Sequence, residues 1–416
     1  MAGLFWTQEQ DIGPSARGGH ATAFDSDHHR VVLFGGDSLR STLFGDTWAW
    51  DGKAWTQVGD TGPSPRTGHH LVYDSAGPSG VLFGGRSSSG ALNGDTWMWD
   101  GELWTQVADT GPDPRTGLQM AFDMARSQVV LFGGEAAGNA LRRDTWEWDG
   151  QVWTQRDDTG PTARRQHALT FDSTRGRVVL FGGDTGGTTV GDTWEWDGTS
   201  WTQVADTGPD PCAGAAMTFD GSAVLLFGGT ESIAASNPPP RLFGLTWQWD
   251  GQHWTALQDI GPAPRWGHTI AFDSNRGRLV LFGGVSVPPG DPNAADHALA
   301  DTWETAAPEA TATGEVQLTS IAITPDTVTA AVLNTSPSAL TLSVGLDHPA
   351  PANGVMVDIA VSNAGVELGT LGLPVPASSS GAQMPNPLVS AGLPAADYQF
   401  EGKLGNSTQT ATLHVT

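Results

Sequence analysis

One phrase recurs six times in the first three quarters of the chain, and it constrains the fold more than any other feature. In its clearest copy it consists of LFGG at residues 82–85, DTWMWDG at 95–101 and WTQ at 104–106. The diglycine begins at Gly35, Gly84, Gly133, Gly182, Gly228 and Gly283, in steps of 49, 49, 49, 46 and 55 residues. A period near 50 residues indicates an array of similar structural units packed against one another.

Each copy predicts four short strands. Residues 268–272 (HTIAF) and 278–282 (RLVLF) illustrate the first and second strands. The D-T-W-x-W segment forms the third strand, an Asp-Gly pair signals a hairpin, and the W-T-Q segment forms the fourth. This pattern resembles the kelch repeat, in which every repeat forms one blade of a β-propeller. The resemblance implies an all-β, six-bladed propeller over residues 1–305.

The sixth copy is incomplete at its end. It contains Asp301-Thr302-Trp303 but lacks the Asp-Gly pair and the W-T-Q segment, which stands instead at residues 6–8. We therefore expect the N-terminal strand to complete blade 6, which leaves no open edge between the first and last blades. The tryptophans follow the same period, and among 18 only Trp266 lies outside it.

Composition excludes several classes of function. The net charge of −25 argues against nucleic acid and anionic membranes as partners. The single cysteine, Cys212, excludes an internal disulfide and a cysteine-based zinc site, and no cofactor is expected. No apolar run is long enough for membrane insertion. No signal peptide is visible, and the sequence leaves the location open: the cell surface or the exterior if a leader was removed, otherwise the cytoplasm or a secreted particle.

A second domain follows the repeats. Residues 306–314 are rich in Ala and Thr, include Pro308 and Gly314, and are predicted to be a linker. Residues 315–416 lack the repeated phrase and contain short period-2 segments, such as VMVDIAV at 355–361, which predict a small β-sandwich. The domain resembles the immunoglobulin-like repeats of bacterial surface proteins, without their Cys-Trp-Cys signature.

An arginine precedes the first strand of five blades. The series is Arg17, Arg66, Arg115, Arg164 and Arg265, and Cys212 takes its place in blade 5. Because the first strand lines the channel of a propeller, these residues are predicted to ring the channel mouth. Kelch proteins that capture acidic peptides use arginines at comparable positions, and the resemblance implies an anion site. The alternative is structural pairing with the aspartates found about six residues earlier: Asp11, Asp60, Asp109, Asp158 and Asp259.

Further irregularities fall on the same face, which carries the strand 2–3 and strand 4–1 loops. Arg165 adds a second arginine, Trp266 departs from the period, and the strand 2–3 loops of blades 5 and 6 are long, at residues 230–244 and 285–300. Together with the arginine series and Cys212, Arg165 and Trp266 complete the predicted ligand-binding set. The histidines of the repeat (His20, His69, His167 and His268) are too far apart around a ring to bind one metal ion, so no metal site is predicted.

These features favour a non-catalytic recognition or assembly module that binds a partner protein, an anionic ligand or a glycan at this face. One alternative is an enzyme acting on an acidic sugar, similar to the kelch mutarotase of sialic acid. Glu135 and Glu231 would then be candidate acid–base groups, and Cys212 with His297 a candidate nucleophile and base. Another alternative is a structural component of a surface appendage or an injection particle. Copper-radical oxidases also combine a kelch propeller with an immunoglobulin-like domain, but their chemistry needs two metal-binding tyrosines. This chain has only Tyr73, which occupies a core position, and Tyr398, which lies in the second domain, so that function is excluded.

Overall fold

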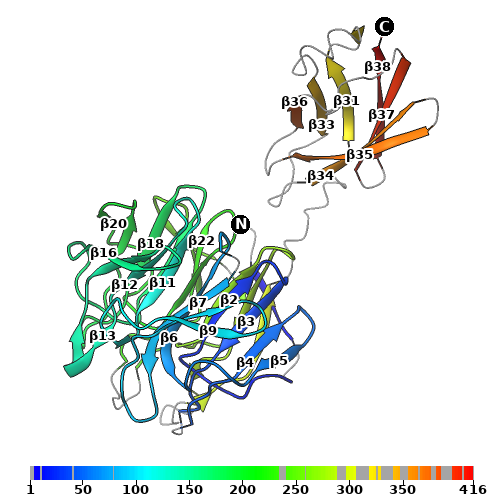
Figure 1. Ribbon diagram of the computed structural model, residues 1–416. Coiled ribbons are helices and arrows are strands. Elements are labelled where there is room, and N and C mark those ends of the chain that lie inside the picture. The colour runs from blue at the N-terminus through cyan, green and yellow to red at the C-terminus, as the bar shows by residue number, and fades with distance from the viewer. Residues whose placement is uncertain are drawn as a thin grey trace. The chain divides into compact units, whose positions relative to one another are not determined.

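In the computed structural model of the chain, the first five repeats each fold into a four-stranded antiparallel sheet (Figure 1). The chain divides into two units, Met1–Pro308 and Glu309–Thr416. The structure describes residues 4–9, 12–39, 42–77, 79–233, 240–257, 259–287 and 297–305 of the first unit, and 318–324, 327–328, 341–346, 355–363, 366–375, 381–385, 396–404 and 407–415 of the second. The described residues contain no helix that is long and apolar enough to cross a membrane.

The first unit contains six blades, whose strands run from the channel outward. Blade 1 is β2 (Ala21–Asp25), β3 (Arg30–Phe34), β4 (Thr47–Trp50) and β5 (Trp55–Gly59), and blade 2 is β6 (Thr67–Asp74), β7 (Ser79–Arg86), β8 (Thr96–Trp99) and β9 (Trp104–Ala108). Blade 3 is β11 (Gln119–Asp123), β12 (Gln128–Phe132), β15 (Thr145–Trp148) and β16 (Trp153–Asp157), and blade 4 is β17 (Ala168–Asp172), β18 (Arg177–Phe181), β19 (Thr193–Trp196) and β20 (Trp201–Ala205). Blade 5 is β21 (Ala216–Phe219), β22 (Val224–Phe227), β23 (Thr246–Trp249) and β24 (Trp254–Ala256).

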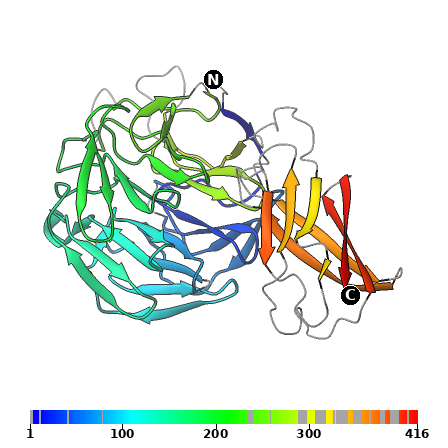
Figure 2. The same cartoon turned by 90° about the horizontal axis from the view of Figure 1, so that it is seen from above.

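Blade 6 is completed by the N-terminal strand, as predicted. It consists of β26 (Thr269–Asp273), β27 (Arg278–Phe282), β30 (Thr302–Thr305) and β1 (Leu4–Gln8), and the short β25 (Asp259–Ile260) pairs parallel to β1 at its outer edge. β1 runs antiparallel to β30 and places Thr7 opposite Glu304. In Figure 2, the blue N-terminal strand lies beside the last, yellow-green blade. The sequence-based prediction of an all-β propeller closed by its N-terminus is confirmed.

Tryptophan side chains of blades 1 to 5 join each of these blades to the one before it. The fourth-strand tryptophan donates a hydrogen bond from Nε1 to the threonine Oγ1 that begins the third strand of the preceding blade. The pairs are Trp55–Thr302, Trp104–Thr47, Trp153–Thr96, Trp201–Thr145 and Trp254–Thr193, all at 2.8 Å. Because Trp55 in blade 1 meets Thr302 in blade 6, the closing interface repeats the contact that blades 2 to 5 make with the blade before them.

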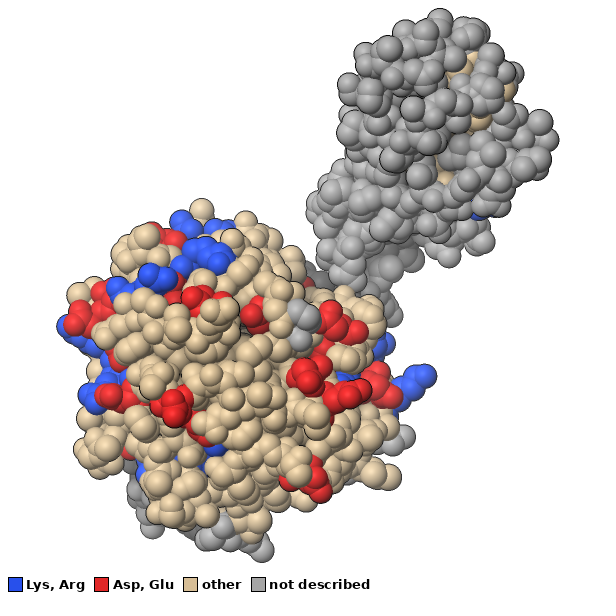
Figure 3. Space-filling model, in the orientation of Figure 1, with Lys and Arg blue, Asp and Glu red and all other residues tan. Residues whose placement is uncertain are grey.

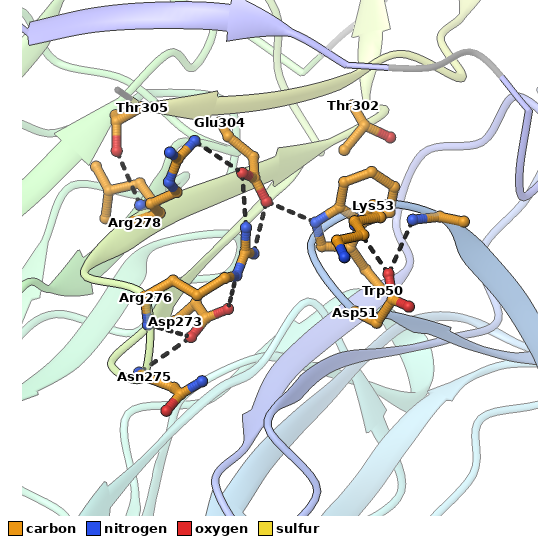
Figure 4. Close-up of polar contacts among 12 residues, drawn as sticks. Trp50, Asp51, Lys53, Asp273, Asn275, Arg276, Arg278, Thr302, Glu304 and Thr305 are labelled. Atoms are coloured by element: carbon orange, nitrogen blue, oxygen red, sulfur yellow. Dashed lines mark hydrogen bonds and ion pairs between the residues drawn. The ribbon is translucent and has the colours of Figure 1, made fainter. Parts of the chain in front are cut away.

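A buried glutamate reinforces three of the blades. In blade 6, Glu304 accepts hydrogen bonds from Arg276 (2.6 and 2.8 Å) and from Trp50 of blade 1 (2.6 Å), and Arg276 also binds Asp273 (Figure 4). Glu147 with Arg126 and Glu195 with Arg175 repeat this arrangement in blades 3 and 4. Blades 1, 2 and 5 have Ala49, Met98 and Gln248 at the glutamate position and lack the matching arginine. The two residues therefore occur together, as expected when burial of either charge alone would be costly.

The second unit consists of two sheets. One has the order β31 (Leu318–Thr324), β33 (Thr341–Leu346) and β36 (Gly381–Pro385). The other has the order β32 (Thr327–Val328), β38 (Ser407–Val415), β37 (Ala396–Leu404), β34 (Val355–Asn363) and β35 (Val366–Val375). Ile359, Tyr398, Phe400 and Leu413 are buried in this unit. Its assignment as an immunoglobulin-like domain stays a prediction, and the predicted linker at residues 306–314 lies outside the described residues.

Replacing Trp6 with alanine should destabilise the propeller strongly. Trp6 is buried in one hydrophobic cluster with Leu225 and Phe227 of blade 5 and Leu281 of its own blade. The loss of a large core side chain costs about 3–5 kcal/mol of unfolding free energy. Urea unfolding followed by fluorescence measures this cost. Thr7→Ala, an exposed position on the same strand, is the control, and an equal effect of both substitutions would contradict a structural role for β1.

Candidate functional site: the mouth of the central channel

Six residues, one from each blade, form a closed ring of backbone hydrogen bonds around the channel. Each N–H donates to the carbonyl oxygen of the equivalent residue in the preceding blade, at 2.7–3.0 Å. The members are Gly19, Gly68, Gly117, Gln166, Gly214 and Gly267, with φ between 52° and 69°. This left-handed conformation favours glycine. With neighbouring Cα atoms about 5 Å apart, as between hydrogen-bonded strands, the ring is roughly 10 Å across.

The channel has two chemically different ends. It encloses a cavity of about 640 Å³, lined by the innermost strand of every blade. At one end the lining includes one aromatic side chain per blade: Phe24, Tyr73, Phe122, Phe171, Phe219 and Phe272. At the other end, beside the ring of backbone hydrogen bonds, it includes Asp37, Arg86, Arg165 and Trp266. Charged groups therefore gather at a single mouth.

The five repeated arginines do not present their charges at this mouth. Arg17, Arg66, Arg115, Arg164 and Arg265 are all 0–1% exposed. Arg17 is representative: it binds both carboxylate oxygens of Asp46 at 2.7 and 3.0 Å and the carbonyl oxygen of Gly35 at 2.9 Å. Their guanidinium groups are therefore enclosed and engaged within their own blades, and they are not part of the channel lining.

The arginine partners also differ from the predicted ones. They are the aspartates that precede the third strand, not those six residues before each arginine: Asp46, Asp95, Asp144, Asp192 and Asp301. Each of these carboxylates also accepts a hydrogen bond from the indole two residues later, as Asp46 does from Trp48 at 2.7 Å. Burial raises the pKa of Asp46, but hydrogen bonds from Arg17 and Trp48 and the charge of Arg17 outweigh it, so this pKa is lowered.

Blade 5 lacks both members of this pair. Cys212 replaces the arginine, and Leu245 stands where the other blades have the aspartate. Cys212 is buried, and burial raises its pKa to about 12. The thiol is therefore protonated and enclosed, which argues against Cys212 as a nucleophile or a ligand contact. The joint replacement by Cys212 and Leu245 is a sequence signal that would have identified the correct arginine partners.

The repeated histidines are core residues. The imidazoles of His20, His69, His167 and His268 pack edge-on against a phenylalanine from the second strand of the preceding blade, at 5.4–5.5 Å between ring centroids. Burial, followed by the charge of the nearby arginine, lowers their pKa values, that of His268 to about 3. Among the described residues, no group of three or more His, Cys, Asp or Glu side chains could hold a metal ion.

The charged side of the mouth is built around Glu135. Its blade 3 segment β13 (Glu135–Ala136) pairs with β10 (Arg115–Thr116) just beyond the ring. Glu135 is buried and forms ion pairs with Arg86 of blade 2, at 3.1 Å, and with Arg165 of blade 4. Arg165 also binds the buried Asp184 at 3.0 Å. Two arginines from separate blades thus converge on one carboxylate, while their side chains remain 40% and 30% exposed.

On the opposite side of the mouth, blade 6 contributes Trp266 and Val285 to the lining, and blade 1 contributes Asp37. Trp266 of blade 6 pairs through its backbone with Val285, and in blade 5 Ala213 pairs with Thr230. The indole of Trp266 lies against Gly214, where an added Cβ would come within 3.1 Å of it. A ligand at this mouth would therefore meet arginine donors on one side and an aromatic surface on the other.

Only two predicted ligand-binding residues reach the channel, namely Arg165 and Trp266. Of the candidate acid–base groups, Glu135 lies at the mouth, whereas Glu231 is exposed and binds the backbone of Arg241. Residues 234–239 and 288–296 of the two long loops lie outside the described residues. Sequence reasoning missed Arg86. The signal that could have found it is the position directly after each diglycine, where the residue type varies between blades: Asp37, Arg86, Glu135, Asp184, Thr230 and Val285.

Charges on the surface are mixed. On the face shown in Figure 3, acidic and basic side chains of the propeller are interspersed, and much of the surface is uncharged. With a net charge of −25, the two exposed guanidinium groups at the mouth are a local departure from the overall charge.

Comparisons with known proteins agree with this fold. Residues 95–284 match the KLHDC2/KLHL20/DRC7 Kelch-repeats domain. The repeats in this segment are therefore similar to kelch repeats. The solved structure of YjhT is similar, with a TM-score of 0.55 and 14% sequence identity over 70% of this chain and 95% of YjhT. At that identity the likeness shows only the fold. No curated protein matches the chain significantly.

Restoring the missing arginine–aspartate pair in blade 5 of the propeller should show that the effects of the two substitutions on the free energy of unfolding are strongly coupled. Cys212→Arg alone buries a guanidinium group without a carboxylate and should cost about 3–5 kcal/mol of stability. Adding Leu245→Asp supplies the partner found in the other blades and should recover much of this loss. Leu245→Asp alone alters a half-exposed side chain and is the control. Strictly additive effects in urea unfolding would contradict this pairing.

The buried histidines should make the propeller sensitive to mild acid. Because folding lowers their pKa values, the unfolded chain takes up protons first as the pH falls below about 6.5. The free energy of unfolding that the neutral histidines contribute is complete above this pH. It declines toward about pH 3, by about 1.4 kcal/mol per pH unit for each proton that the folded state excludes. His167→Leu, which copies Leu118 of blade 3, should reduce the slope between pH 6.5 and 4.5. An unchanged slope, equal to that of the exposed His253→Gln control, would contradict this account.

Proposed function

We propose that the kelch propeller is a non-catalytic recognition module that binds an anionic group at the charged mouth of its channel. The anion belongs to a small ligand, a glycan or a side chain of a partner protein. The observation that carries the proposal is the convergence of Arg86 and Arg165, from two blades, beside the channel.

Both arginines retain donors for a ligand. Among the described residues, Arg86 uses only Nη2, toward Glu135, and Arg165 uses Nη1 and Nε, toward Glu135 and Asp184. The other guanidinium nitrogens are available at the partly exposed mouth. A hydrogen bond between charged groups contributes about 1.5–3 kcal/mol, so two such contacts support specific recognition of an anion.

The acidic partners have a positioning role in this proposal. Glu135 and Asp184 are buried, and their ion pairs hold the two guanidinium groups in place before any ligand arrives. Such preorganisation lowers the entropy cost of binding. Trp266 supplies the apolar wall opposite, suited to the face of a sugar ring or of an aromatic side chain.

A second candidate function is catalysis on an acidic sugar. Glu135 favours it, because a carboxylate at the mouth of a cavity of about 640 Å³ is placed where an acid–base group would act. In this reading Arg86 and Arg165 would hold the sugar carboxylate. The second unit would be a spacer in either case, whether the chain serves on a cell surface or in a larger particle.

Titration calorimetry with glucuronate and its neutral counterpart glucose tests the proposal. The protein should bind glucuronate and not glucose. Arg86→Thr, which copies Thr230 of blade 5, and Arg165→Thr, which copies Thr67 of blade 2, should each weaken binding about tenfold or more. Arg143→Thr, at an exposed position on the same face, is the control.

Two outcomes would overturn the proposed role. If neither glucuronate nor a glutamate-rich peptide binds the unaltered protein, the mouth is not an anion site. If the protein accelerates interconversion of the glucuronate anomers and Glu135→Gln abolishes this, the role is catalytic and the second candidate replaces the first.

A further inference from the structure

We infer that Gln166 determines ligand specificity at the mouth by selecting anions that carry a hydroxyl group beside the charge, as uronic acids do. This inference rests on the proposed anion-binding function. It begins from a position where the repeat is broken: five members of the ring of backbone hydrogen bonds are glycines, and Gln166 is the exception.

The backbone at Gln166 is unfavourable for its side chain. Its φ is 52°, in the left-handed region that costs a residue other than glycine about 1 kcal/mol or more. The ring does not need a side chain there, because five glycines form the same hydrogen bonds. Of the other such residues described, His29, Ser127 and Asn139 lie in turns or a short 3-10 segment, away from the channel lining, whereas Leu39, with φ of 58°, lies in a bend at the mouth and outside the ring. Gln166 is less favourable for this backbone conformation than the glycine of the other blades, which indicates that its side chain has a role beyond folding.

The side chain adds a neutral amide to a mouth whose lining otherwise includes the hydroxyl groups of Thr67 and Thr116 and the charged groups of Asp37, Arg86 and Arg165. Gln166 lines the channel, and its Oε1 is buried without a hydrogen-bond partner among the described residues. Arg86 and Arg165 only donate hydrogen bonds, while Glu135 and Asp184 are negatively charged and already paired. The neutral amide oxygen can therefore accept a hydrogen bond from a ligand without repelling its charge.

The neighbours of Gln166 place this acceptor between the two sides of the mouth. It follows Arg165 directly in sequence, and its backbone carbonyl accepts the hydrogen bond of Gly214 at 2.8 Å. Gly214 is the residue against which the indole of Trp266 lies. A sugar ring stacked on Trp266, with its carboxylate toward Arg165, would direct a neighbouring hydroxyl to the Gln166 amide. The ligand class that fits is a hydroxylated sugar acid.

The substitution Gln166→Gly tests this inference, since glycine is the residue found at the other five positions. Calorimetry with glucuronate and with cyclohexanecarboxylate, which has the charge but no hydroxyl groups, provides the two readouts. Gln166→Gly should raise the melting temperature by relieving the backbone strain. It should weaken glucuronate binding about tenfold and leave cyclohexanecarboxylate binding unchanged.

Ser127→Gly is the matched control. Ser127 has φ of 53° in a turn outside the channel lining, so this substitution should raise the melting temperature without changing affinity for either acid. If Gln166→Gly binds glucuronate as tightly as the unaltered protein while Arg165→Thr does not, the inference is wrong and the anion site stands. If the unaltered protein binds neither acid, the proposed function is wrong, and the role of Gln166 falls with it.

Discussion

The ring of six backbone hydrogen bonds around the channel is the constraint on which the rest of the propeller depends. Each bond joins one blade to the next, so the ring forms only when the last blade meets the first. Every member of the ring has a left-handed backbone, which explains the glycine two residues after four of the five repeated arginines and two residues after Cys212. The same ring separates a charged mouth from a channel lined mostly by apolar strands, and it makes Gln166 conspicuous.

Regular and irregular residues have different roles in this molecule. The residues that recur in most blades, such as Arg17 with Asp46, or Trp55 with a threonine of the preceding blade, are buried and satisfy one another. The charged groups that recur from blade to blade have partners that recur with them, so their hydrogen bonds are made within the protein and not to a ligand. The mouth is instead formed by positions that differ between blades, including Arg86 and Glu135.

Paired replacements within the chain show which contacts depend on each other. Blade 5 loses an arginine and its aspartate together, at Cys212 and Leu245, and the buried glutamates occur only in blades with the matching arginine, as for Glu304 and Arg276. Both patterns have one cause: an ionised group enclosed without its counter-charge would be strongly destabilising. Six copies of one blade thus allow comparisons that normally require related proteins.

The sequence by itself determined the number of blades, their strands and the closing role of residues 4–8, because these follow from local periodicity and from one incomplete repeat. It also pointed to Arg165 and Trp266, which depart from the pattern. It did not determine which charges are buried, since Arg17 and Arg165 carry the same side chain and differ only in surroundings. That distinction arises from partners 19 to 49 residues away, such as Asp184 for Arg165 and Glu135 for Arg86. Only the folded ring brings these residues together.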